Sequence, residues 1–144
     1  MKKLLVIWTL MSFFLSAQAQ NLPAKSKQII FIENNFSTAL KQAKAKRKYI
    51  FLDAYTSWCG PCKKLKNTTF KDSLTADFFN KNFVNAAIDM EKGQGIDLAL
   101  EWDVQEYPTL LVLDDKGKIV LRSVGYLSAK QLTDFGKEAL RIRN

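Results

Sequence analysis

The stretch that decides the fold is SWCGPCKK, residues 57–64, which holds both cysteines of a 144-residue chain without histidine. It follows YIFLDAY (49–55), a nearly continuous apolar run of the kind that forms a strand buried on both faces. A buried strand that leads into a helix at Cys59 places this sulfur among the unpaired amides at the positive end of the helix dipole. A thiolate is stabilised there, and the thiolate is the nucleophile in disulfide exchange.

Two cysteines separated by two residues fit a redox dithiol, half of a metal site or a structural disulfide. A tetrahedral zinc site needs four nitrogen or sulfur ligands, and the chain has no third cysteine. A disulfide across so short a loop restricts the unfolded chain very little. The spacing therefore favours a redox pair in which Cys59 attacks a partner disulfide and the more shielded Cys62 resolves the mixed intermediate. Pro61 suits the first helical turn because it has no amide proton, and neither a metal nor another cofactor is expected.

The rest of the sequence alternates between patterns typical of strands and of helices. The residues DDKG at 114–117 suit a hairpin turn, and Ser128 with Gln131 forms a capping box for a last helix. This order predicts an α/β sandwich with a mixed central sheet. Strands are expected at 29–32, 49–55, 83–89, 109–113 and 118–124, and helices across 36–48, from Cys59 onward, and at 73–81, 95–102 and 128–142.

Three of these helices carry apolar stripes that are expected to face the core. The first also holds the densest basic stretch, KQAKAKRK at 41–48. We interpret this stretch as a solvated helix face rather than a nucleic-acid contact, because no interleaved aromatics or nucleic-acid motif accompany it. The core-facing residues are expected to be Phe36, Leu40 and Ala43, then Leu74, Phe78 and Phe79, and finally Leu132, Phe135, Ala139 and Ile142.

Residues 1–19 have the pattern of a secretory signal peptide: a positive start, an apolar stretch at 4–15 and an A-x-A cleavage pattern. The apolar stretch is shorter than the roughly 20 residues that cross a bilayer, so a cleaved leader is favoured over an anchor helix. The mature chain is expected to be soluble and periplasmic or secreted. The predicted divisions are a signal peptide at 1–19, a linker at 20–28 and one domain at 29–144.

The run W-C-G-P-C-K from Trp58 to Lys63 resembles the active-site motif of the thioredoxin family, and the similarity covers about residues 29–142. The resemblance implies a thioredoxin-like fold, with a mixed central sheet flanked by helices on both faces, and thiol-disulfide oxidoreductase activity. It also implies that Asp53, six residues before Cys59, is a buried carboxylate that accepts and returns the proton of Cys62. A carboxyl in so apolar a run is expected to have a raised pKa.

The resemblance further implies a substrate-binding surface around the dithiol. A cis-proline loop at Tyr107 and Pro108 would face the two sulfurs, and Gly125 would lie near the same surface. Two residues depart from the family pattern. Tyr55 replaces a frequent tryptophan. Asn85 stands where a lysine paired with the buried carboxylate is expected, so proton transfer through Asp53 is expected to be tuned differently. The substrate-binding residues implied are Trp58, Gly60, Pro61, Tyr107, Pro108 and Gly125.

The residues between the cysteines bear on the direction of electron flow. Gly60 and Pro61 offer no imidazole to hold a thiolate, which favours a reductase over a strong oxidant. The segment at 51–70 resembles the soluble domains of disulfide-interchange proteins, which implies protein disulfide substrates, such as misoxidised envelope proteins or apocytochromes, and a membrane-bound electron donor. An oxidase or isomerase with the same residues, or a non-catalytic module that binds peptides around Trp58, remains open.

Overall fold

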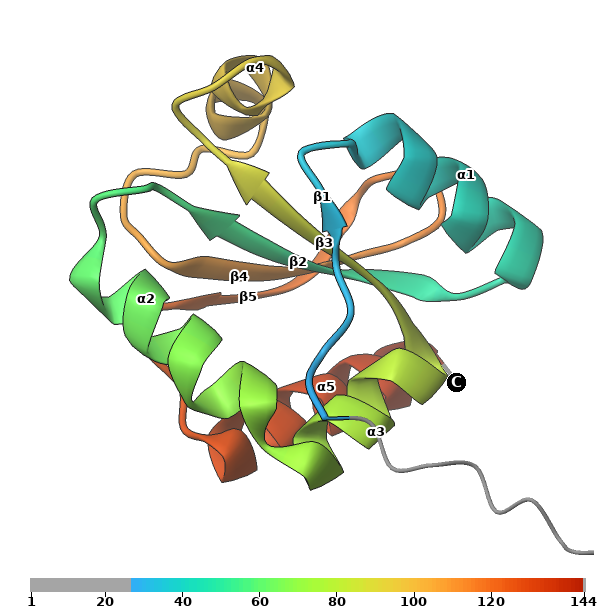
Figure 1. Cartoon of the computed structure of the whole chain (residues 1–144). Coiled ribbons are helices and arrows are strands. Elements are labelled where there is room, and N and C mark those ends of the chain that lie inside the picture. The colour runs from blue at the N-terminus through green and yellow to red at the C-terminus, as the bar shows by residue number, and fades with distance from the viewer. Residues whose placement is uncertain (1–26, 144) are drawn as a thin grey trace, which may run out of the picture.

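A mixed five-stranded sheet with the order β1-β3-β2-β4-β5 forms the centre of the computed structural model, which describes residues 27–143 (Figure 1). In the described residues, four of its strands run in the same direction and the fifth, β4, runs antiparallel to them. The predicted signal peptide, and the predicted linker up to residue 26, lie outside the described residues. The strands that share a direction are β1 (Ile32–Glu33), β3 (Phe83–Asp89), β2 (Tyr49–Tyr55) and β5 (Ile119–Val124), and the opposing strand is β4 (Thr109–Leu113).

Helices cover both faces of this sheet, so the predicted layer arrangement is confirmed (Figure 1). The two faces pack against separate cores because alternate residues of a strand point to opposite sides: Ile50 and Leu52 belong to one cluster, and Phe51 belongs to the other. One face is covered by α1 (Phe36–Lys46) and α4 (Gln94–Glu101), and the other by α2 (Gly60–Asn67), the short 3₁₀ helix η1 (Thr69–Lys71), α3 (Ser73–Asn82) and α5 (Ala129–Arg143).

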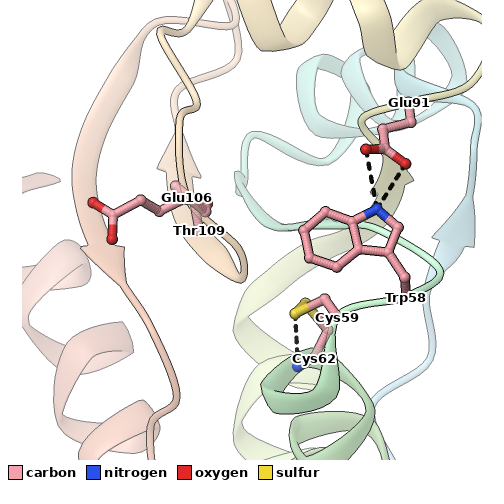
Figure 2. The surroundings of a disulfide bond; sticks show 6 residues. All are labelled: Trp58, Cys59, Cys62, Glu91, Glu106 and Thr109. Atoms are coloured by element: carbon pink, nitrogen blue, oxygen red, sulfur yellow. Dashed lines mark hydrogen bonds between the residues drawn. A yellow bond between two sulfur atoms is a disulfide. The ribbon is translucent and has the colours of Figure 1, made fainter.

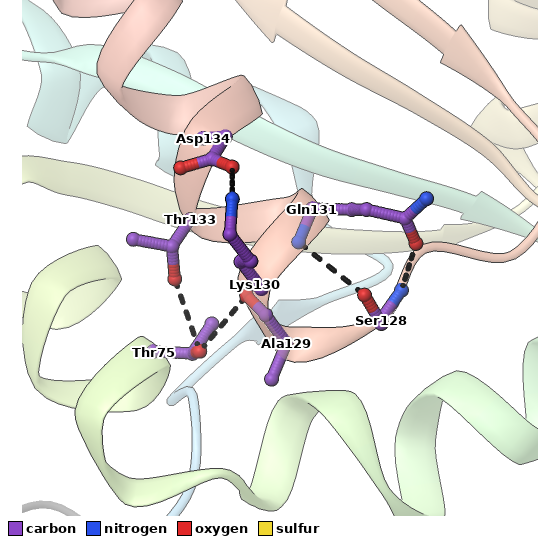
Figure 3. Close-up of polar contacts among 7 residues, drawn as sticks. All are labelled: Thr75, Ser128, Ala129, Lys130, Gln131, Thr133 and Asp134. Atoms are coloured by element: carbon purple, nitrogen blue, oxygen red, sulfur yellow. Dashed lines mark hydrogen bonds and ion pairs between the residues drawn. The ribbon is translucent and has the colours of Figure 1, made fainter.

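The start of α5 is fixed by its own cap and by α3 (Figure 3). The amide of Gln131 donates to the hydroxyl of Ser128 over 3.4 Å, and the Ser128 amide donates to Oε1 of Gln131 over 2.9 Å, which confirms the predicted capping box. From α3, the hydroxyl of Thr75 donates to the carbonyl oxygen of Ala129 over 3.3 Å and lies 3.1 Å from the Thr133 hydroxyl. These contacts hold α5 against the layer that also contains α2.

Three details of the predicted packing are wrong. The strand expected at 29–32 is limited to Ile32 and Glu33, because the amides of Ile29 and Ile30 are bound by the Phe70 carbonyl and the Asn80 side chain instead of a neighbouring strand. Leu74 is 71% exposed on the outer side of the first turn of α3. Ile142 is also exposed, since it lies in the last turn of α5, beyond the buried Ala139.

Candidate redox site

The two cysteines form a disulfide at the first turn of α2 (Figure 2). Cys59 is the N-cap of this helix, and its sulfur accepts the amide of Cys62 over 3.1 Å. Pro61 occupies the first turn, as predicted. The placement of Cys59 at the positive end of a helix is thus confirmed. The expected difference in shielding is not seen in the disulfide form, where Cys59 is 3% and Cys62 is 5% exposed.

Trp58 forms the exposed side of the site. Trp58 is 63% exposed. Its indole Nε1 donates to both carboxylate oxygens of Glu91, over 3.0 and 2.9 Å (Figure 2). The ring of Tyr107 meets the indole edge to face, with 6.0 Å between ring centroids. Sequence reasoning missed Glu91, although the residue follows the end of β3 and Trp58 follows the end of β2, and adjacent parallel strands end at the same edge of a sheet.

The loop from Tyr107 to Thr109 faces the disulfide across the site (Figure 2). The Tyr107–Pro108 peptide bond is cis, as the family resemblance implies. The amide of Gly125 donates to the carbonyl oxygen of Pro108 over 2.8 Å, and Gly125 has a φ of +91°, which favours glycine. The structure therefore brings the predicted Tyr107, Pro108 and Gly125 together. Gly60 is exposed and has open space where a side chain would begin.

Asp53 lies in the middle of β2, where it is buried, and its Oδ1 has no hydrogen-bond partner among the described residues. Burial raises the pKa of this carboxyl from 3.8 to about 7. The negative charge of Glu33 raises the pKa further, and the positive charge of Lys66 lowers it. The predicted buried carboxyl with a raised pKa is therefore present, next to two charged groups that the sequence did not single out for it.

A cavity of about 250 Å³ connects this carboxyl with the dithiol. Asp53, Thr56 and Cys62 are among the buried residues that line it, and exposed Glu33 and Lys66 are among those at its rim. Cys59 is not among the lining residues. The cavity thus gives the second cysteine and Asp53 a common space that reaches the surface.

Asn85 does not take the place of the expected lysine beside Asp53. Its side-chain amide donates to the carbonyl oxygen of Ile30 over 3.3 Å and to Asn80 over 3.1 Å, so it binds the segment before β1. In the sheet, the β3 residue in register with Asp53 is Ala87. The cation whose charge lowers the Asp53 pKa comes from α2, as Lys66.

Neither a metal site nor a membrane helix is found in the part of the chain that the structure describes. Within residues 27–143, no three histidine, cysteine, aspartate or glutamate side chains are grouped so that they could hold a metal ion. No helix in this range is long and apolar enough to cross a membrane.

Comparison with known proteins decides the family. A model of the thioredoxin-like domain matches residues 36–140. The chain belongs to the thioredoxin-like family. The predicted fold and the predicted class, a thiol-disulfide oxidoreductase with a CxxC pair, are confirmed at this level.

Curated relatives of this thioredoxin-like chain include much longer proteins. Protein disulfide-isomerase of Datisca glomerata is 30% identical over 94 residues, which make up 65% of this chain and 18% of that protein. The thiol:disulfide interchange protein DsbD of Pseudoalteromonas atlantica is 28% identical over 111 residues, 74% of this chain and 19% of that protein. The chain therefore spans about a fifth of the length of each.

Similar solved structures have nearly the same length as the matched region. A proposed disulphide-isomerase from Bacteroides thetaiotaomicron is 45% identical, with a TM-score of 0.71 over 81% of this chain and 97% of that one. A thioredoxin from Nicotiana alata is 28% identical, with a TM-score of 0.61 over 83% of this chain and 97% of that one. Both solved chains thus share the fold of the described residues over nearly their whole length.

Proposed function

We propose that this protein reduces disulfides of other proteins outside the cytoplasm. The observation that carries the proposal is the Cys59–Cys62 disulfide at the start of α2, adjacent to a cavity that also contains the carboxyl of Asp53. These three residues are the proposed catalytic groups. The Cys59–Cys62 dithiol is the proposed redox group, and no metal or other cofactor is proposed.

The reduced protein begins the reaction with the thiolate of Cys59, which the amides at the start of α2 stabilise. This sulfur attacks a substrate disulfide, and one substrate sulfur leaves as a thiolate. Cys62 then gives its proton to Asp53 and attacks Cys59. The Cys59–Cys62 bond forms, the bond to the second substrate sulfur breaks, and the electron pair leaves with that sulfur. The substrate is reduced and the enzyme is oxidised.

The proposed substrate surface surrounds Cys59. The rings of Trp58 and Tyr107 form an aromatic platform beside the sulfur, and the backbone of the loops at Pro108 and Gly125 borders the opposite side. Gly60 has no side chain and Pro61 has a short one, so neither blocks the approach of a peptide to the Cys59 sulfur. Such a surface accepts an extended peptide segment with little dependence on its sequence.

The residues between the cysteines support the proposed direction of electron flow. Without an imidazole near Cys59, the reduced form lacks the stabilisation that makes a strong oxidant. Equilibration of the Cys59–Cys62 pair with glutathione, read by mass spectrometry of alkylated protein, is expected to give a potential near that of thioredoxins, about −270 mV. A potential near about −180 mV, as in isomerases, would instead favour the isomerase activity named for several relatives.

Turnover separates an enzyme from a peptide-binding module. Insulin reduction by dithiothreitol is expected to be accelerated by the wild-type protein and not by the Cys59→Ser variant. Acceleration that survives Cys59→Ser would argue for binding without exchange chemistry at the dithiol.

The location and the electron donor are proposed from the leader pattern and from the similarity to DsbD. Export predicts that the protein purified from the native envelope begins at Gln20, which N-terminal sequencing tests. A membrane-bound donor is expected to recharge the oxidised dithiol. Expression of a Cys62→Ala variant in the native host is expected to trap substrates, and the donor, as mixed disulfides with Cys59 that diagonal electrophoresis separates.

A further inference from the structure

Two carboxyl groups flank one alanine on the α2 side of the sheet. Ala87 of β3 is in register with Glu33 of β1 on one side and with Asp53 of β2 on the other. Residues in register on parallel strands point to the same face, and strands lie about 4.8 Å apart, so the backbones of Glu33 and Asp53 are separated by roughly 10 Å. A direct proton transfer requires about 3 Å between heavy atoms. The small side chain of Ala87 leaves room between them.

The cavity occupies this space. Its lining includes Glu33, Ala87 and Asp53, and its volume of about 250 Å³ is enough for several water molecules, each of which takes about 30 Å³ in the liquid. Water also needs polar partners. Oδ1 of Asp53 and the hydroxyl of Thr56 are buried, line the cavity and have no hydrogen-bond partner among the described residues.

The titratable groups around Asp53 come from three elements. Glu33 lies on β1, Lys63 and Lys66 lie on α2, and Tyr55 follows on β2 itself. The remaining titratable neighbour at the cavity is Cys62. Glu33 is an exposed carboxyl in this set, so it has access both to the cavity and to bulk solvent.

We propose that Glu33 is a second proton-transfer residue, which receives the proton of Asp53 through water in this cavity and passes it to solvent. The proposal rests on the proposed function, because it requires Cys62 to be the resolving thiol. When Cys62 attacks Cys59, its proton moves to Asp53, the electron pair of the broken bond leaves on the substrate sulfur, and Asp53 is deprotonated again through Glu33. In the reverse direction the proton follows the same route inward.

The two thiol steps separate in a single-turnover reaction of the reduced protein with excess dithiobis(nitrobenzoic acid). Attack by Cys59 releases the first thionitrobenzoate at a rate that depends on reagent concentration. Attack by Cys62 releases the second thionitrobenzoate at a rate that is independent of reagent concentration. Both releases are followed by absorbance in stopped flow, and mass spectrometry of acid-quenched samples identifies the Cys59 adduct.

Glu33→Gln is expected to slow the second phase about tenfold at pH 6 and to leave the first phase unchanged. The tenfold effect is smaller than the roughly 10²–10⁴-fold rate acceleration that a positioned general acid or base contributes. Glu33→Asp is expected to keep the wild-type rate, and formate to restore the second phase of Glu33→Ala. Ala87→Leu, which fills the cavity without changing a charge, is expected to slow the same phase. Glu101→Gln, an exposed carboxyl on α4, is the matched control.

The direction of the effect of Glu33→Gln distinguishes proton transfer from a purely electrostatic influence. Loss of the negative charge makes Asp53 easier to ionise, so a purely electrostatic Glu33 predicts a faster second phase at pH 6. A faster or unchanged second phase in Glu33→Gln would overturn the proposal. Loss of the first phase in the wild type would instead refute the role of Cys59, and the proposed function with it.

Discussion

Replacement of Asp53 by asparagine is predicted to stabilise the oxidised protein, and the gain is predicted to grow with pH. Asparagine has nearly the shape of a protonated carboxyl but does not ionise. In the folded protein, the pKa of Asp53 is raised to about 7 because the carboxyl is buried, with Glu33 contributing, while Lys66 opposes the shift. In the unfolded chain the pKa returns to 3.8.

The magnitude follows from proton linkage. Between pH 3.8 and 7, the folded protein keeps a proton that the unfolded chain releases, so the free energy of unfolding falls by about 1.4 kcal/mol per pH unit. Above pH 7 both states are ionised and the loss is complete, at about 4 kcal/mol. The Asp53→Asn variant does not carry this cost. It is expected to match the wild type near pH 4 and to exceed its stability by about 4 kcal/mol at pH 8.

The assay is urea unfolding of both oxidised proteins at unit steps from pH 4 to pH 8. Asp97→Asn is the control, since Asp97 is an exposed aspartate of α4, and its replacement is expected to change the unfolding free energy by less than about 1 kcal/mol. A stability difference for Asp53→Asn that is constant with pH, or largest at pH 4, would refute the claim that the buried carboxyl ionises at a cost.

Three further variants test the geometry around the site. Gly95→Ala is expected to lower the free energy of unfolding by about 2 kcal/mol or more, because its Cβ would lie 2.0 Å from the carbonyl oxygen of Asp89. Gly60→Ala is the control: its Cβ would meet nothing within 4 Å, and it is expected to lower the free energy of unfolding by less than about 1 kcal/mol. Equal losses for the two variants in urea unfolding would contradict the prediction. Glu91→Gln weakens the charge-assisted hydrogen bond to Trp58 and is expected to raise KM for insulin about fivefold with kcat nearly unchanged. A fall in kcat alone would contradict the role of Glu91 in positioning Trp58.

Local patterns in the sequence predicted the parts of the fold that depend on local chemistry. The buried strand that leads into Cys59, the cap at Ser128 and the hairpin at 114–117 each place the required residue types at the required spacing. In the hairpin, Oδ1 of Asp114 accepts the amides of residues 116 and 118, and Gly117 has a φ of +83°. Such contacts form between near neighbours, so their signals are visible in a short segment.

The missed features depend on contacts between distant segments. Glu33 reaches the Asp53 cavity only because the strand order places β1 beside β3, and no local pattern gives that order. The family resemblance predicts that Asn85 takes the place of a lysine paired with Asp53, but its side chain binds the chain before β1. The apolar stripe at 73–81 predicts that Leu74 faces the core with Phe78 and Phe79, although its position in the first turn of α3 turns it toward solvent.

The most direct test of the account is alkylation of the reduced protein by iodoacetamide over a pH series, with the modified cysteine identified by mass spectrometry. A thiolate held at the start of α2 predicts that Cys59 reacts at least about tenfold faster than Cys62 at pH 7, and that its rate levels off well below pH 8.5, where a free cysteine ionises. Equal rates at the two cysteines, or a Cys59 rate that still rises through pH 8.5, would contradict it.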